Sequence, residues 1–249
     1  IRDQPRSRGL GDVYKRQTPQ PQMVDTWTQS DDGMNWSFTL RDGLNWHDGS
    51  AVTAADCVAS LERWGKRDGM GQALMKHMGS MTAIDDKTFE MKLAKPFGLV
   101  LESIGKISSN VPFMMPARVA ATDAFEQISD FTGSGPFMFN KDEWVPGSKV
   151  VYKKFDGYNP RSEPASAAAG GKLALVDAVE WTYFPDQMTA MNALMAGEVD
   201  YFESPANDLA PMMAANPDIT VEVNDPLGNI GFLRFNHVQP PFDNVAIRR

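Results

Sequence analysis

Apolar and polar residues alternate over two short stretches in the first half of the chain, as they do in a half-buried β-strand. Residues 36–40 place their apolar side chains on one face of a predicted strand, namely Trp36, Phe38 and Leu40. Residues 88–93 repeat this alternation, with Phe89, Met91 and Leu93 facing inward. Asp85 and Asp86 follow residues 81–84, so we expect a hairpin whose adjacent carboxylates form the turn rather than an acid and base pair.

A capping sequence precedes a helical pattern between these strands. Thr53 is followed three residues later by Asp56, which predicts a helix over residues 54–64. Three apolar residues recur at helical spacing along it: Cys57, Leu61 and Trp64. The cysteine is therefore expected to be a small buried hydrophobe and not a nucleophile.

The second half of the chain interleaves short strands with helices, which is the pattern of an α/β fold. The predicted strands are residues 150–152, 179–183, 199–202, 220–223 and 230–235. Asp186 is expected to cap a helix that ends at Gly197 and buries one apolar face, made of Met188, Met191, Leu194 and Met195. Residues 157–171, rich in Gly, Ser, Pro and Ala, are expected to form a flexible surface excursion.

Composition narrows the class of protein. With 249 residues and 42% apolar side chains, the chain can bury one large or two ordinary domains. Its 24 basic and 32 acidic residues give a net charge of −8, which disfavours nucleic acid as a partner. No apolar run is long enough to span a membrane. A single cysteine and three well-separated histidines make a disulfide or a structural metal site improbable, and no cofactor is indicated.

The first seventeen residues differ from the rest. Residues 1–17 contain five basic and two acidic side chains and show neither an apolar core nor a regular period. We interpret this segment as extraneous to the folded protein, for example a cloning or sequence-assembly remnant. A native disordered basic tail is the alternative, and neither reading bears on function.

Linear motifs of common enzymes are missing. Residues 133–137, Gly-Ser-Gly-Pro-Phe, have two glycines but neither a third nor a lysine, so they predict a tight backbone turn and not a phosphate cradle. The chain has no Gly-x-Ser-x-Gly elbow and no His-Glu-x-x-His. These absences weaken the hydrolase hypothesis, although an enzyme without a linear motif stays an alternative.

Several motifs in a fixed order resemble one family. They are residues 24–27 (VDTW), 30–33 (SDDG), 38–43 (FTLRDG), 46–50 (WHDGS), 52–56 (VTAAD), 60–63 (SLER), 133–137 (GSGPF), 193–200 (ALMAGEVD), 235–236 (FN) and 241–248 (PFDNVAIR). Together they resemble the extracellular solute-binding proteins of family 5, the dipeptide, oligopeptide and nickel type receptors of ABC importers. The resemblance spans residues 21–249.

This resemblance implies an α/β fold of the periplasmic binding protein type II kind, with two lobes that close on a ligand like a hinge. We expect the chain to hold the first lobe with an inserted subdomain, the second lobe being mostly absent, and to lack the family's opening strand and export signal. The expected division is residues 1–17 extraneous, 18–128 a hairpin-rich inserted subdomain, 129–236 the α/β part of the first lobe on a mixed sheet, and 237–249 the start of the crossing into the second lobe.

Two segments are candidate ligand contacts, because sites in open α/β folds lie at strand ends facing a cleft. The loop after a helix predicted to end near Gly105 offers Lys106, Ser108, Ser109 and Asn110. A crossing strand over residues 229–236 presents Asn229, Phe232 and Arg234. An ordinary solvated loop and plain sheet packing are the alternatives. Trp36 and Trp46 are expected in the core, and His47 is expected to fix the fold around the Asp48-Gly49 turn.

The functional hypothesis is a receptor, not an enzyme, that captures a short peptide or peptide-like solute and delivers it to a membrane permease driven by an ATPase. It is expected to be a monomer when complete, in the periplasm or outside the cell as a membrane-anchored lipoprotein. Within the family, nickel chelates, haem and oligosaccharides are alternative ligands. A hydrolase acting on similar ligands, or a chaperone-like protein of the same fold, is the alternative from another class.

Overall fold

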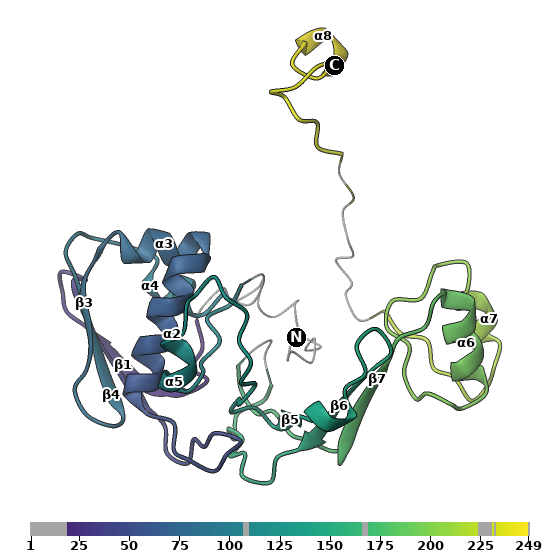
Figure 1. Cartoon of the computed structure of the whole chain (residues 1–249), viewed down its shortest axis with the longest axis horizontal. Helices are drawn as coiled ribbons and strands as arrows, with labels where there is room; N and C mark the ends of the chain where they lie inside the picture. Colours follow the sequence, from purple (N-terminus) through teal and green to yellow (C-terminus); the bar gives the residue numbers. More distant parts are fainter. Residues whose placement is uncertain (1–18, 107–109, 166–168, 224–230, 232, 249) are drawn as a thin grey trace.

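The computed structural model describes residues 19–106, 110–165, 169–223, 231 and 233–248. Figure 1 shows these residues as an open arc. A four-stranded sheet with its helices lies at one end, a three-stranded sheet lies in the middle, and a small helical unit lies at the other end. The last helix, α8 (Val245–Arg248), stands apart from all three.

The first sheet has the order β1-β2-β4-β3 and is antiparallel throughout. Its strands are β1 (Val24–Gln29), β2 (Asn35–Leu40), β3 (Met78–Ala83) and β4 (Thr88–Leu93). On the inner face Trp36 lies opposite Met91, and Phe38 lies opposite Phe89 with ring centroids 5.1 Å apart. The two alternating stretches are therefore confirmed as strands, each with its apolar side buried.

The turn between β3 and β4 depends on one of the predicted carboxylates. Asp85 Oδ1 accepts hydrogen bonds from the backbone N–H groups of Lys87 and Thr88, both at 2.8 Å. These two N–H groups do not take part in the strand-to-strand hydrogen bonds of the hairpin, and the Asp85 carboxylate accepts from them in place of water, as in other Asx turns. The interpretation of Asp85 as a turn former is confirmed.

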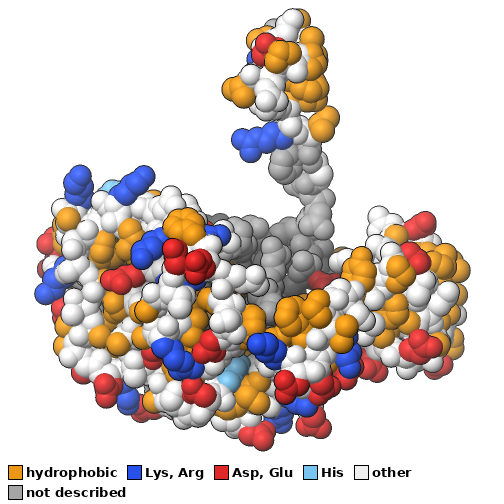
Figure 2. All heavy atoms as spheres, in the orientation of Figure 1, with side chains coloured by type: hydrophobic (Ala, Val, Ile, Leu, Met, Phe, Trp, Pro, Cys, Tyr) orange, Lys and Arg blue, Asp and Glu red, His pale blue; other side chains and the backbone are white. Residues whose placement is uncertain are grey.

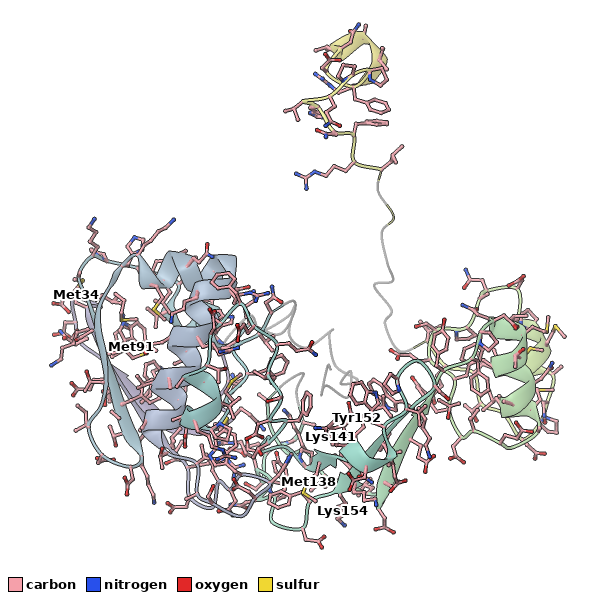
Figure 3. The ribbon with its side chains drawn as sticks, in the orientation of Figure 1. Met34, Met91, Met138, Lys141, Tyr152 and Lys154 are labelled. Atoms are coloured by element: carbon pink, nitrogen blue, oxygen red, sulfur yellow. The ribbon has the colours of Figure 1, made fainter. Side chains whose placement is uncertain are left out.

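Four helices accompany the first sheet: α2 (Ala54–Arg67), α3 (Gly69–Met75), α4 (Val100–Ile104) and α5 (Ala117–Ala120). The predicted capping box is present, since Asp56 N–H donates to Thr53 Oγ1 and Thr53 N–H donates to Asp56 Oδ2. The sheet and helices enclose one apolar core, whose largest fully buried side chains are Phe38, Trp46, Leu61, Leu74, Met91 and Val100. Figure 3 shows Met91 on the side of the sheet that faces α2. Cys57 belongs to this core, as predicted.

The second sheet has the order β5-β6-β7, with β5 (Phe137–Phe139), β6 (Lys149–Lys154) and β7 (Ala178–Thr182). A 3₁₀ turn, η1 (Lys141–Glu143), precedes β6. On one face Tyr152 lies between Phe139 and Trp181, with centroid distances of 6.0 and 5.9 Å. Both predicted strands in this region are confirmed. The expected mixed sheet is not seen, because every strand pair between described residues is antiparallel.

The helical unit consists of α6 (Gln187–Met195) and α7 (Ala210–Ala214). Asp186 Oδ1 accepts from the N–H of Thr189 at 2.8 Å, which confirms the predicted cap. Only part of the predicted apolar face is buried: Met191 is 3% exposed, whereas Met188 is 47% and Met195 is 41% exposed. Within the described residues, Met191 packs in a small apolar cluster with Leu209 and Met213, and the outer methionines Met188 and Met195 lie at its exposed side.

Three of the predicted strands are wrong over the residues that the structure describes. Residues 199–202 and 220–223 are irregular, as are residues 231 and 233–235. A strand needs a neighbouring chain to receive its backbone hydrogen bonds, and no described segment pairs with these three. Their alternating apolar residues were therefore not sufficient to make them strands.

The segment expected to be a flexible excursion is attached to the first sheet. Arg161 Nη1 donates to the carbonyl of Val24 at 3.1 Å, and Asn159 Nδ2 donates to the carbonyl of Asp42 at 3.1 Å. Arg41 Nη2 in turn donates to the carbonyl of Asn159 at 2.5 Å. The described part of residues 157–171 thus closes over the edge strand β1 and its neighbouring turn, although it has almost no regular secondary structure.

Candidate ligand-binding surface

The turn after Trp46 is built from short polar contacts. Asp48 Oδ1 accepts from the N–H of Ser50 at 3.0 Å and from its hydroxyl at 2.6 Å, and Gly49 has a φ of +85°, which favours glycine. The hydrogen bonds from Ser50 hold the pKa of Asp48 below its ordinary value, and the nearby Arg118 adds to this. Arg118 also lies 3.1 Å from Asp130, so it joins the turn to the segment before residue 133.

His47 connects this turn to the Gly-Ser-Gly-Pro-Phe segment. Its backbone N–H donates to the carbonyl of Gly133 at 2.8 Å, and its Nδ1 accepts from the N–H of Gly133 at 3.2 Å. Its Nε2 lies 3.0 Å from the carbonyl of Gly135 and donates to it in this tautomer. The ring also meets Phe155 edge-on, with centroids 5.0 Å apart. Two motifs that are far apart in sequence therefore meet at one imidazole, between the two sheets.

Lys106 is held in an ion pair with the residue that caps α3. Its Nζ lies 2.8 Å from Asp68 Oδ2, while Asp68 Oδ1 accepts from the N–H groups of Met70 and Gly71. Burial by itself would raise the pKa of Asp68, but the Lys106 ammonium and the two N–H donors outweigh it and lower the pKa below its ordinary value. The ammonium of Lys106 thus stabilises the fold at this position.

Asn110 lies beside α2 in a left-handed conformation, with a φ of 48°. Its carbonyl accepts from Trp64 Nε1 at 2.6 Å. It borders a hollow of about 280 Å³ whose lining residues come from α2 and from residues 110–115: Ser60, Arg63, Trp64, Arg67, Asn110, Val111, Phe113 and Met115. Of the loop candidates, the structure therefore brings Asn110, but not the ammonium of Lys106, to the edge of a concave surface.

The remaining candidates are not gathered at this hollow. Arg234 is exposed and lies in the irregular segment that leads to α8, which Figure 1 shows apart from α2 and α4. Ser108, Ser109, Asn229 and Phe232 lie outside the described residues.

Outside the predicted candidates, the described part of the chain shows neither a reactive cysteine nor a group of metal ligands. Burial raises the pKa of the Cys57 thiol to about 12, which keeps it protonated and unreactive. Among the described residues no group of three or more His, Cys, Asp or Glu is arranged to hold a metal ion. Within those same residues, none of the helices combines the length and the apolar character that crossing a bilayer requires.

Sequence reasoning missed the two arginines beside the hollow. Arg63 and Arg67 lie one turn apart on α2 and flank Trp64. Their i, i+4 spacing was visible in the sequence, but nothing there indicated that the residues facing them would leave a concavity. Figure 2 shows a second unpredicted feature, apolar side chains at the surface over the second sheet and the α6–α7 unit. Trp181 of β7 and Met188 of α6 are both half-exposed.

Comparison with known proteins assigns the family. The model of the bacterial extracellular solute-binding proteins, family 5 Middle, matches residues 18–249, so the chain belongs to this family. A probable peptide ABC transporter periplasmic-binding protein, y4tO of Sinorhizobium fredii, is 41% identical over 233 residues, which are 93% of this chain and 43% of that protein.

Solved structures agree on the fold. The binding protein AgaA from A. tumefacien R10, in complex with agropinic acid, is 28% identical with a TM-score of 0.60 over 79% of this chain and 37% of its own. The binding protein MoaA from the same source, in complex with mannopinic acid, has a TM-score of 0.68 at 22% identity over 92% of this chain and 44% of its own. The chain thus has a periplasmic binding protein fold and spans less than half the length of the relatives it matches.

Proposed function

We propose that the protein containing this chain is the substrate-binding receptor of an ABC importer. The observation that supports this most strongly is the match of the family 5 model across residues 18–249, together with the solute-binding function named for the 41% identical relative. Binding by differential affinity for the closed state, rather than chemical conversion, is the mechanism of such a receptor. We therefore propose that it is not an enzyme.

The proposed ligand is a short peptide or peptide-like solute. The name of the S. fredii relative supports a peptide, and the likeness to AgaA supports opine-type acids as a second candidate. Nickel chelates are less favoured, because no described group of side chains is arranged to ligate a metal ion directly.

The proposed partners are a membrane permease and its ATPase, and the proposed location is the periplasm or the outer face of the cell membrane. We also retain the division into an inserted subdomain over residues 18–128 and an α/β part over 129–236. The described first sheet falls within the former and the second sheet within the latter. Asn110 and Arg234 stay proposed ligand contacts, with Ser108, Ser109, Asn229 and Phe232, whereas Lys106 is proposed to support the loop through Asp68.

A retention experiment tests this function. The intact protein is incubated with a mixture of short synthetic peptides, agropinic acid and nickel–histidine, and bound compounds are identified by native mass spectrometry. We expect one peptide class to be retained and recovered with unchanged mass. Recovery of cleaved peptides would establish an enzyme instead, and retention of agropinic acid alone would replace the peptide by an opine.

One variant tests the contribution of the crossing segment. Arg234→Gln is expected to weaken retention of the peptide, since it removes an exposed cation from a proposed ligand contact. Lys141→Gln is the matched control, because Lys141 is also exposed and lies at η1 beside the second sheet (Figure 3). Equal affinity of the two variants, measured by isothermal titration calorimetry, would remove Arg234 from the site.

A further inference from the structure

Two guanidinium groups on α2 have no anionic partner in the described structure. Arg63 is only 8% exposed, and its hydrogen bonds go to neutral groups: the carbonyl and hydroxyl of Thr122 and the carbonyl of Glu126. Arg67 donates to the carbonyl of Ala124 at 2.8 Å. Among the described residues, neither has a carboxylate oxygen within 4.0 Å.

This arrangement is unusual for a chain with a net charge of −8. A buried cation without a counter-ion keeps part of its desolvation cost even when carbonyls accept its protons. By contrast, Lys106, another cation near the interior, is paired with Asp68. The region around Arg63 and Arg67 is therefore a local positive field on an otherwise acidic protein.

Both arginines line the hollow of about 280 Å³, so the positive field opens onto an accessible concavity. The other walls are mostly apolar or aromatic, with Trp64, Val111, Phe113 and Met115, and Asn110 stands at the edge. Phe113 is half-exposed, so part of the apolar wall is in contact with solvent. The guanidinium carbon of Arg67 lies over the ring of Phe125, 5.2 Å from its centroid, in a cation–π contact.

We propose that this hollow is a binding site for a small organic anion, a carboxylate attached to an apolar or aromatic body. The carboxylate would take the N–H groups of Arg67 that no described acceptor uses, with Arg63 supplying charge from beneath. The apolar body would cover Trp64, Val111 and Phe113. The volume lies just below the range of about 300–1,000 Å³ for pockets that hold drug-sized ligands, so it suits a single ring and not a peptide.

The hollow lies apart from the proposed receptor contact at Arg234, although Asn110, another proposed contact, stands at its edge. The anion site is inferred from Arg63 and Arg67 and does not depend on the proposed function. A bound anion would neutralise the buried charge of Arg63 and add a link between α2 and residues 110–115. Two side chains of α2 already contact this segment: Trp64 donates to the carbonyl of Asn110, and Ser60 bonds to the backbone of Met115. The anion is therefore a stabilising ligand of the first-sheet part of the molecule.

Benzoate is the probe, with benzamide as its uncharged isostere, and binding to the intact protein is measured by isothermal titration calorimetry. We expect saturable benzoate binding with a dissociation constant of about 1 mM or lower and no benzamide binding. Arg67→Gln is expected to weaken benzoate binding about tenfold. Lys66→Gln, the adjacent exposed cation that does not line the hollow, is expected to leave it unchanged.

Four results would overturn the proposal. They are no saturation by benzoate, equal binding of benzamide, an equal loss in both variants, and displacement of benzoate by the solute that the receptor retains. The last result would place benzoate in the receptor's own ligand site. The peptide retention experiment has a different readout, so failure of one proposal is distinguishable from failure of the other.

Discussion

Asp56 shows how much of this fold depends on a single polar side chain. Its carboxylate, which is buried, accepts from Trp46 Nε1 at 3.2 Å, from the N–H and hydroxyl of Thr53 at 2.8 Å, and from the N–H of Ala117 at 2.6 Å. These four bonds join the turn after β2, the start of α2 and the start of α5. The sequence indicated only the capping part of this role.

Asp56→Ala is expected to lower the free energy of unfolding by about 3 kcal/mol, because four buried or half-buried donors lose their acceptor. Urea unfolding followed by circular dichroism measures the change. Asp31→Ala is the control, since Asp31 is exposed and has no hydrogen bond or ion pair in the described structure, and a change below about 0.5 kcal/mol is expected there. Equal effects of the two substitutions would show that the Asp56 contacts contribute nothing.

The Asp68–Lys106 pair makes stability depend on pH at the acidic end. The pKa of Asp68 is lowered in the fold, so the ionised carboxylate stabilises the protein fully above its ordinary pKa of 3.8. This contribution is lost as the pH falls below 3.8 and through the lower value in the folded state.

Asp68→Asn is therefore expected to destabilise the protein by about 1–3 kcal/mol at pH 7, and this difference should shrink as the pH falls towards 3. Urea midpoints measured across this range for both proteins test it. A difference that stays constant down to pH 3 would mean that the carboxylate charge is not involved.

At the scale of elements, two helix caps were predicted correctly from the sequence, whereas the buried face of α6 was predicted only in part. Thr53 and Asp186 cap α2 and α6 as their local sequences indicate, because capping bonds connect residues only three positions apart. The exposure of Met188 and Met195 depends instead on the small size of the unit that α6 packs against.

Two methionines of α6 give a matched comparison. Met191→Ala is expected to lower the stability of the α6–α7 unit by about 2–4 kcal/mol, because it leaves a cavity against Leu209 and Met213. Met188→Ala, on the exposed side of the same helix, is expected to change it by less than about 0.5 kcal/mol. Hydrogen exchange of the α6 amides measures both. An equal effect would mean that both methionines are buried in solution.

At the scale of the whole molecule, His47 fastens the first sheet to the segment that leads into the second. Its ring accepts a hydrogen bond from the N–H of Gly133, lies within hydrogen-bond distance of the carbonyl of Gly135, and contacts the ring of Phe155 after β6. Arg118 provides a second link through Asp48 and Asp130. Residues 157–161 add further hydrogen bonds to the first-sheet part, at Gln22, Val24, Arg41, Asp42 and Asn45.

His47→Ala is expected to speed hydrogen exchange of the Gly133 amide at least about tenfold, because that amide loses its acceptor. The matched control is His77→Ala, since His77 also uses a ring nitrogen for a backbone carbonyl and packs against the ring of Phe97, but entirely within the first-sheet part. It should leave Gly133 unaffected. Unchanged exchange in His47→Ala would show that the junction is held by Arg118 and residues 157–161.

The sequence by itself determined the features whose cause is local or periodic: the two alternating strands of the first sheet, the predicted helix caps, the burial of Cys57 and the order of the family motifs. Those patterns arise from interactions among residues close in the chain, or from the repeat of one buried face. Only the tertiary structure decided which predicted strands found partners, how His47 joins two distant motifs, and that Lys106 is paired while Arg63 and Arg67 border a hollow. Each of these depends on what lies opposite a residue in space, and a strand or a charge has no pattern of its own that specifies its neighbour.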